Sequence, residues 1–204
     1  NGASSADHYE QKLAPYLLET FNNSLENMGK ATSWVSIGPQ WAEASTAPFS
    51  LYKKYTRQGG VVAPMIIAGP DVTHRGEVTA AFSTVMDVAP TILDYARFDL
   101  AIDQASAFPM LGESMRELLA GSASRIHADE YSVAMAHIGK AFFRYGDWKL
   151  VTLNAPFDES KFELYNLAND PGEQVDLRQA VPEQYARMVD LWRRESKRQG
   201  VQLP

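Results

Sequence analysis

The 204-residue sequence contains no cysteine. Disulfide scaffolds, thiolate metal sites and cysteine nucleophiles are therefore excluded within these residues, because each of them needs a cysteine sulfur. The absence does not indicate a compartment, since cysteine-free chains suit the cytosol and the periplasm alike.

Long apolar runs and a surplus of basic residues are also missing. The longest apolar stretch, Val61–Ala68, is interrupted by Pro64 and is far shorter than the roughly 20 residues that cross a bilayer. Nineteen basic residues against 25 acidic ones give a net charge of −6, so little positive charge is available to neutralise nucleic-acid phosphates. We expect neither membrane insertion nor general nucleic-acid binding.

Local catalytic motifs are scarce as well. The four histidines, His8, His74, His127 and His137, show no spacing typical of metal ligands. The sequence has no nucleophile elbow, Walker loop, dinucleotide-binding fingerprint or EF-hand pattern. No single segment therefore predicts a complete active site.

The first part of the chain predicts one short helix, one strand and one longer helix. Residues 1–60 are loop-rich, with a short helix expected at 13–21. Val61–Ala68 is rich in β-branched residues and lies between Gly59-Gly60 and Gly69-Pro70, which is typical of a strand buried on both faces. A helix is expected over 84–96, with Asp87 as its cap. Because an α/β sheet needs several strands, we expect its other strands to lie outside this sequence.

The second part of the chain is typical of antiparallel hairpins followed by a helix. Short strand-like segments occur at Ser132–Met135, Ala141–Tyr145, Trp148–Leu153 and Phe162–Leu167. In Pro182–Arg198 an apolar stripe recurs at helical spacing, formed by Tyr185, Met188, Val189 and Trp192. The basic residues at its C-terminal end complement the helix dipole.

Two features could contribute to a site. Lys53 lies six residues before Gly59, just upstream of the expected strand, where a lysine could present its ammonium to an anion at the edge of a sheet. Lys54 would serve equally well on this reasoning. The side-chain oxygen of Asn1 suits Ca²⁺ or Mg²⁺, but one oxygen is far fewer than the six to eight that Ca²⁺ takes.

Several segments carry a family resemblance and occur in the order found in that family. They are Asn1-Gly2; Thr46–Lys53 with Gln58–Gly60 and Pro64; Val85–Asp94; Gly146–Leu150; and Glu163–Glu173 followed by Asp176-Leu177. Together they span nearly the whole chain and resemble the C-terminal part of the type I sulfatases, close to the bacterial arylsulfatases. The combination is specific, although each segment alone is weak.

The resemblance implies an α/β fold class. Residues 1–120 would form the C-terminal part of an alkaline-phosphatase-like α/β sandwich, and residues 121–204 a small subdomain of antiparallel strands with an amphipathic helix. It also implies hydrolysis of a small-molecule sulfate ester by a formylglycine nucleophile, with Ca²⁺ polarising the sulfate oxygens. By this resemblance Asn1 matches a Ca²⁺ ligand, and Lys53, selected over Lys54 by its spacing to the glycine pair, matches the lysine that contacts the sulfate.

The sequence also departs from the family pattern. It lacks the Cys/Ser-x-Pro-x-Arg motif that supplies the nucleophile, the N-terminal aspartate pair, and the aspartate that should precede Asn1. We expect these groups on an upstream portion of the same enzyme, so that these residues alone neither bind Ca²⁺ tightly nor hydrolyse sulfate esters. Two alternatives stay open: a phosphonate or phosphate ester hydrolase of the same superfamily, and a non-catalytic binding module. The sequence indicates neither an oligomeric state nor the natural ester.

Overall fold

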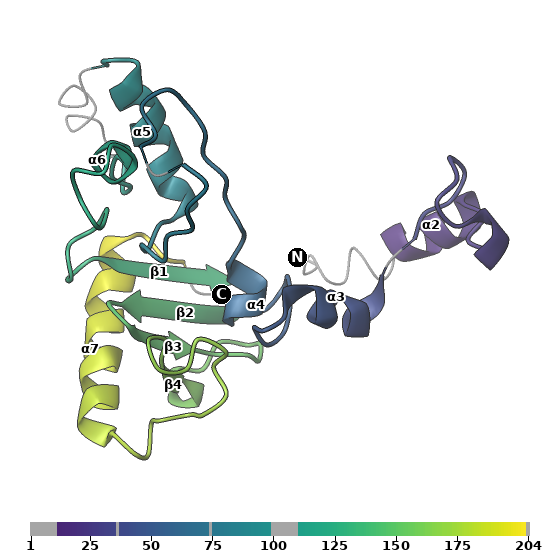
Figure 1. Ribbon diagram of the computed structural model, residues 1–204. Helices are drawn as coiled ribbons and strands as arrows, with labels where there is room; N and C mark the ends of the chain where they lie inside the picture. The colour runs from purple at the N-terminus through teal and green to yellow at the C-terminus, as the bar shows by residue number, and fades with distance from the viewer. Residues whose placement is uncertain (1–11, 36, 74, 99–109, 203–204) are drawn as a thin grey trace. The chain divides into compact units, whose positions relative to one another are not determined.

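The computed structural model describes residues 12–35, 37–73, 75–98 and 110–202 (Figure 1). The chain divides into two compact units, residues 1–62 with 132–204 and residues 63–131. The division expected from the sequence, at residues 120 and 121, refers to the larger enzyme and stays a prediction. No helix among the described residues has the length and apolar character needed to cross a bilayer.

A four-stranded antiparallel sheet forms the centre of the first unit (Figure 1). Its strands, in spatial and chain order, are β1 (Ser132–His137), β2 (Lys140–Tyr145), β3 (Trp148–Val151) and β4 (Glu163–Asn166). Tyr145 pairs with Trp148 across the hairpin, and Gly146 makes the turn with φ of 57°. The four strands expected from the sequence are confirmed, with small differences at their ends.

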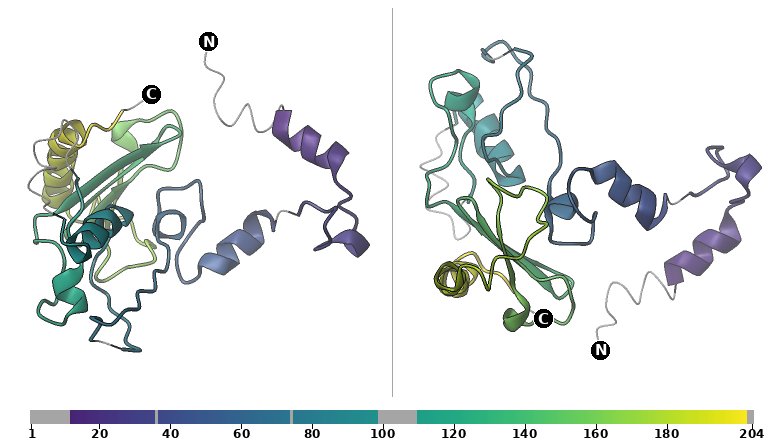
Figure 2. Two further views of the ribbon diagram at one scale, coloured as in Figure 1. Left: turned by 90° about the horizontal axis from the view of Figure 1, so that it is seen from above. Right: turned by 60° about the horizontal axis from the view of Figure 1, so that its bottom comes forward.

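Helix α7 (Pro182–Arg198) covers one face of this sheet (Figure 2). Its bounds are those expected, and Met188, Val189 and Trp192 of the expected stripe are buried. They pack against the strand side chains of Phe143, Leu150 and Leu164 together with Phe162. The ring of Trp192 meets that of Phe162 edge-on, with centroids 5.4 Å apart.

The opposite face carries a second, smaller apolar cluster. Phe142, Val151 and Tyr165 point to this side, where Val61 and Leu153 pack on them. Val61 ends α4 (Gln58–Val61), so α4 and α7 lie on opposite faces of the sheet (Figure 2). The alternation of side chains along each strand therefore supplies both clusters.

Other short helices belong to the first unit. Helix α2 (Ala14–Thr20) confirms the short helix expected at 13–21. Helix α3 (Gly38–Thr46) was not expected, because Gly38-Pro39 is typical of a loop; a proline in the first helical turn is tolerated, since its missing N–H needs no partner there. The described residues of this unit also include two 3-10 turns, η2 (Leu25–Asn27) and η5 (Glu159–Lys161).

The second unit contains the expected helix but not the expected strand. The 3-10 turn η3 (Val85–Asp87) leads into α5 (Val88–Tyr95), and α6 (Arg116–Leu119) follows later. The prediction of a strand over Val61–Ala68 is wrong: Val61 ends α4, and the residues after it join no ladder. Ile66 is 95% exposed. A central strand needs hydrogen-bonding neighbours, and no segment among the described residues supplies them.

Candidate functional site

Lys53 lies on a tight turn with its side chain in solvent. It occupies a central position of the turn Tyr52–Tyr55, which is closed by the Tyr55 N–H donating to the Tyr52 carbonyl oxygen at 3.1 Å. Lys54, the other central residue, has φ of 101°. Within the described part of the chain, no acidic side chain lies at ion-pair distance from Lys53 or Lys54. The turn therefore carries two lysines that form no ion pair with any described residue.

The glycine pair that follows Lys53 lets α4 pack directly on this turn. A Cβ atom on Gly59 would lie 2.1 Å from the Leu51 carbonyl oxygen, and one on Gly60 would lie 2.1 Å from the Tyr55 carbonyl oxygen. Both distances are far below van der Waals contact. The spacing between Lys53 and the glycine pair thus has a structural reason, because only residues without a side chain fit against the carbonyl just before the turn and the carbonyl at its end.

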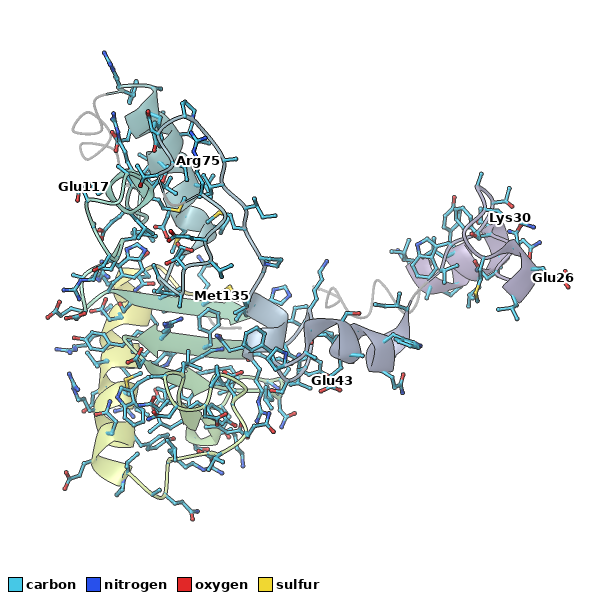
Figure 3. The ribbon with its side chains drawn as sticks, viewed as in Figure 1. Glu26, Lys30, Glu43, Arg75, Glu117 and Met135 are labelled. Atoms are coloured by element: carbon cyan, nitrogen blue, oxygen red, sulfur yellow. The ribbon has the colours of Figure 1, made fainter. Side chains whose placement is uncertain are left out.

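Helix α3 holds the same segment from its N-terminal side. The Leu51 N–H donates to Glu43 Oε1 at 3.2 Å, and Glu43 is labelled on α3 in Figure 3. Thr46 Oγ1 donates to the Leu51 carbonyl oxygen at 2.7 Å. Both the N–H and the carbonyl oxygen of Leu51, two residues before Lys53, are therefore hydrogen-bonded to side chains of α3.

A buried ion pair anchors the start of α4 to the sheet. Lys149 Nζ of β3 lies 2.8 Å from Glu173 Oε1, and the two side chains are 1% and 0% exposed. The other carboxylate oxygen of Glu173 accepts the Gln58 N–H at 2.6 Å, while Lys149 Nζ donates to Gln58 Oε1 at 3.0 Å. Burial lowers the pKa of Lys149 to about 8, although the charge of Glu173 acts in the opposite direction. Gln58 is therefore bound through both its backbone and its side chain.

Arg57 makes a second set of contacts with the same face of the sheet. Its guanidinium donates to Glu163 Oε2 at 2.8 Å and to the Tyr165 hydroxyl at 2.6 Å, and that hydroxyl donates to Glu163 at 2.8 Å. Burial and the neighbouring Glu163 carboxylate raise the pKa of Tyr165 well above its usual value, so the phenol stays protonated. Thr56 Oγ1 also donates to the Thr152 carbonyl oxygen at 2.7 Å.

Sequence reasoning missed most of this anchoring. Lys149 and Glu173 are far apart in the sequence, and neither residue type indicates burial. Another missed residue, Lys140, opens β2 and is only 7% exposed, with its Nζ 5.3 Å from the centroid of the Tyr55 ring. One signal was available for both lysines: each lies beside apolar residues of a predicted strand.

Asn1, the expected calcium ligand, lies outside the described residues. Among residues 12–35, 37–73, 75–98 and 110–202, no group of three or more histidines, aspartates and glutamates is arranged to hold a metal ion. The assignment of Asn1 therefore stays a prediction, as does the role of Lys53.

The second unit contains a buried carboxylate and imidazole pair. Asp87 Oδ2 lies 3.0 Å from His127 Nε2, and both side chains are almost inaccessible. The other oxygen of Asp87 accepts the Glu113 N–H at 2.9 Å, and the His127 ring stacks on Tyr131 with centroids 3.6 Å apart. Contrary to the sequence prediction, the Asp87 side chain does not cap α5: its Oδ2 accepts the Thr84 N–H at the start of η3 at 2.6 Å. Asp87 thus joins η3 to residues 113 and 127, a structural role that its isolation from solvent supports.

The chain belongs to a sulfatase family. Residues 49–198, about three quarters of the sequence, match the family described as N-sulphoglucosamine sulphohydrolase, C-terminal. This range contains the Lys53 turn, the glycine pair, the sheet and α7. The resemblance inferred from the sequence is confirmed by this match.

Two curated relatives and one solved structure extend the comparison. The chain is 37% identical over 118 residues to an arylsulfatase of Klebsiella aerogenes, covering 56% of this chain and 25% of that protein. It is 29% identical over 182 residues to an uncharacterized sulfatase of Schizosaccharomyces pombe, covering 84% of this chain and 31% of that protein. The structure of Ps i-CgsB in complex with k-i-k-neocarrahexaose matches with a TM-score of 0.55 at 21% identity, over 74% of this chain and 32% of that one.

These comparisons define the fold class and the extent of the match. The α/β class with a small antiparallel sheet and a terminal helix is confirmed. The chain spans between a quarter and a third of the length of the relatives that it matches.

The glycine contacts yield a first prediction. Gly60→Ala should displace the Lys53 turn, because the new Cβ meets a backbone oxygen that cannot move without shifting the turn. If the free energy of opening this segment falls by about 1–3 kcal/mol, the population of its open form rises at least about fivefold. Limited trypsin digestion followed by mass spectrometry should therefore show faster cleavage after Lys53 and Lys54. Gly69→Ala is the matched control, since no atom lies within 4 Å of its Cβ position; equal cleavage in the two variants would contradict the prediction.

The buried ion pair yields a prediction on pH dependence. The pKa of Lys149 is about 8 in the folded chain against 10.5 ordinarily, so between these values the unfolded chain binds more protons. The free energy of unfolding should then rise with pH from about 8 to 10.5, by on the order of 3 kcal/mol from this group. Urea titrations should show this rise relative to the double variant Lys149→Met with Glu173→Gln, which removes both charges. If the free energies of unfolding of the two proteins changed with pH in parallel, the lowered pKa of Lys149 would be refuted.

Proposed function

We propose that this chain is the C-terminal part of a sulfate ester hydrolase and that Lys53 contacts the sulfate group. The observation that carries the proposal is the family match over residues 49–198, which includes the Lys53 turn and its glycine pair. Lys53 is exposed and pairs with no acid among the described residues, which supports the role, because a compact cation suits a tetrahedral oxyanion.

Lys53 would act by electrostatic stabilisation. Negative charge accumulates on the oxygens of the sulfate group during transfer, and a cation held in advance at that place lowers the barrier without reorganisation. The contacts of Gly59, Gly60 and Leu51 with the turn provide this preorganisation. Arg57 and Lys149 are already committed to Glu163 and Glu173, so they position the turn and do not compete for the sulfate.

The remaining chemistry would come from groups upstream of the described residues. A formylglycine would supply the nucleophile, and Ca²⁺ would polarise the sulfate oxygens, with Asn1 as one ligand. On this proposal the 204 residues alone hydrolyse no sulfate ester.

Substitution of Lys53 tests the proposal in the complete enzyme. Lys53→Ala should lower kcat/KM for an aryl sulfate by about 100-fold or more, because removing one group that stabilises the developing charge has this effect in other enzymes. Lys161→Ala, which removes an exposed lysine of η5, should leave the rate unchanged.

The same assay should include a matched aryl phosphate. Faster turnover of the sulfate than of the phosphate is expected of a sulfatase, and the reverse order would indicate a phosphate ester hydrolase of the same superfamily. An unchanged rate for Lys53→Ala would remove Lys53 from the mechanism. Failure of the complete enzyme to hydrolyse either ester would favour a non-catalytic module.

A further inference from the structure

His127 is buried in the second unit, and only one of its two ring nitrogens is hydrogen-bonded. Its side chain is 3% exposed, and Nε2 lies 3.0 Å from Asp87 Oδ2. Nδ1 is also out of contact with solvent, and within the described part of the chain it forms no hydrogen bond. Because a buried polar atom without a partner is costly, the protonation of this nitrogen needs an explanation.

The hydrogen bonds of Asp87 decide which ring nitrogen carries the first proton. Asp87 Oδ2 accepts the Thr84 N–H at 2.6 Å, and Oδ1 accepts the Glu113 N–H at 2.9 Å. Both oxygens are therefore acceptors, which is the pattern of an ionised carboxylate, so Nε2 of His127 donates to Oδ2. A neutral ring with its proton on Nε2 has a lone pair on Nδ1.

The surroundings of Nδ1 suit a second proton on the ring. Glu113 Oε1 lies 3.4 Å from Nδ1, which is within ion-pair distance. A lone pair on Nδ1 would face this negative oxygen, whereas an N–H would be attracted to it. The ring also stacks on Tyr131, with centroids 3.6 Å apart and planes at 8°, and the face of an aromatic ring attracts a cation. Both contacts favour an imidazolium over a neutral imidazole.

The segment that contains Glu113 packs closely on η3 and α5. A Cβ atom on Gly112 would lie 2.1 Å from the Met86 carbonyl oxygen, so the two backbones are in direct contact. The Met115 N–H donates to Thr91 Oγ1 of α5 at 2.9 Å. Contacts therefore lie on both sides of Glu113, and a change at its side chain acts on the whole segment.

We propose that His127 is a proton-dependent lock that holds residues 111–115 against η3. With a proton on each ring nitrogen, His127 attracts the carboxylates of Asp87 and Glu113 and so joins the two segments. After loss of the Nδ1 proton, the lone pair repels Glu113, whose side chain is 51% exposed and can turn into solvent. The lock is therefore closed at low pH and opens as the pH rises.

Within the described residues, the titratable groups in contact with the ring come from three segments. Asp87 belongs to η3, Glu113 precedes α6, and Tyr131 precedes β1. Phe82 also lies near the ring, with centroids 5.9 Å apart, and its side chain carries no charge. Among these types of side chain, histidine is the one that changes its charge between about pH 5 and 8. The lock should therefore respond over that range.

Amide hydrogen exchange of the complete enzyme, followed by residue-resolved mass spectrometry from about pH 5 to 9, tests the lock. Protection factors correct for the intrinsic dependence of exchange on pH, and they report how often the Glu113 and Met115 amides open. In the wild type these two protection factors should fall at least about tenfold as the pH rises, because a charge-assisted contact is lost. Amides of β2 serve as the internal reference.

Two variants remove the lock in different ways. His127→Gln keeps a donor for Asp87 but has no proton to lose, and Glu113→Gln keeps the size of the side chain without its charge. The fall in protection with rising pH should be absent in both. His137→Gln, which removes an exposed histidine of β1, is the matched control and should retain the fall.

The lock is overturned if protection at Glu113 and Met115 in the wild type does not change with pH. It is also overturned if the fall persists in His127→Gln, because another group then titrates, or in Glu113→Gln, because the ring then acts on another partner. If His127→Gln does not fold, Glu113→Gln decides alone, since this substitution leaves the buried pair with Asp87 intact. No activity is measured, so the outcome is independent of the proposed function.

Discussion

The ion pair between Lys149 and Glu173 lies out of contact with water beneath the segment that carries Lys53. Two charges removed from water are stabilising only when they compensate each other and satisfy their remaining hydrogen-bonding groups. Here the second oxygen of Glu173 accepts the Gln58 N–H, and Lys149 donates to the Gln58 side chain. The start of α4 is therefore tied to β3 and to the loop after β4, and the position of the Lys53 turn depends on this connection.

The cations around the turn divide into two groups with different roles. Arg57 is half-buried and forms an ion pair with Glu163, and Lys149 is buried and forms an ion pair with Glu173. Lys53, Lys54 and Lys140 form no ion pair with a carboxylate of the described residues. The first group fixes the geometry, and the second presents positive charge in that geometry. Such an arrangement is what the proposed role of Lys53 as a sulfate contact requires.

The parts of the fold that follow from local patterns were predictable. The hairpin strands alternate around short turns, and α7 carries a helical stripe that becomes the core around Trp192. The strand over Val61–Ala68 was predicted wrongly, because a β-branched run indicates a strand only where neighbours pair with it. The composition of residues 61–68 shows that the segment could form a strand, whereas formation of the strand depends on other segments that pair with it.

Lys53 was predictable from the sequence as the cation of the candidate site, whereas the contacts that hold its turn in place were not. The family resemblance selects Lys53 and the glycine pair, yet the reason for their spacing, contact with the Leu51 and Tyr55 carbonyls, appears only in the folded chain. Lys149 and Glu173 meet across 24 residues, and no periodicity relates them. Lys140 could not be recognised as uncompensated without knowing which acids lie near it. Asn1 lies outside the described residues, so its role depends on the resemblance alone.

Amide hydrogen exchange in Glu173→Gln tests most directly whether the buried ion pair holds the Lys53 turn. The variant leaves Lys149 without its counter-charge and weakens the acceptor of the Gln58 N–H. Exchange at Gln58, Gly59 and Tyr55 should accelerate at least about tenfold relative to amides of β2, which serve as the internal reference. Glu159→Gln, which breaks a more exposed pair with Arg193, should leave these amides unchanged. Unchanged exchange at Gln58 and Tyr55 in Glu173→Gln would contradict the account.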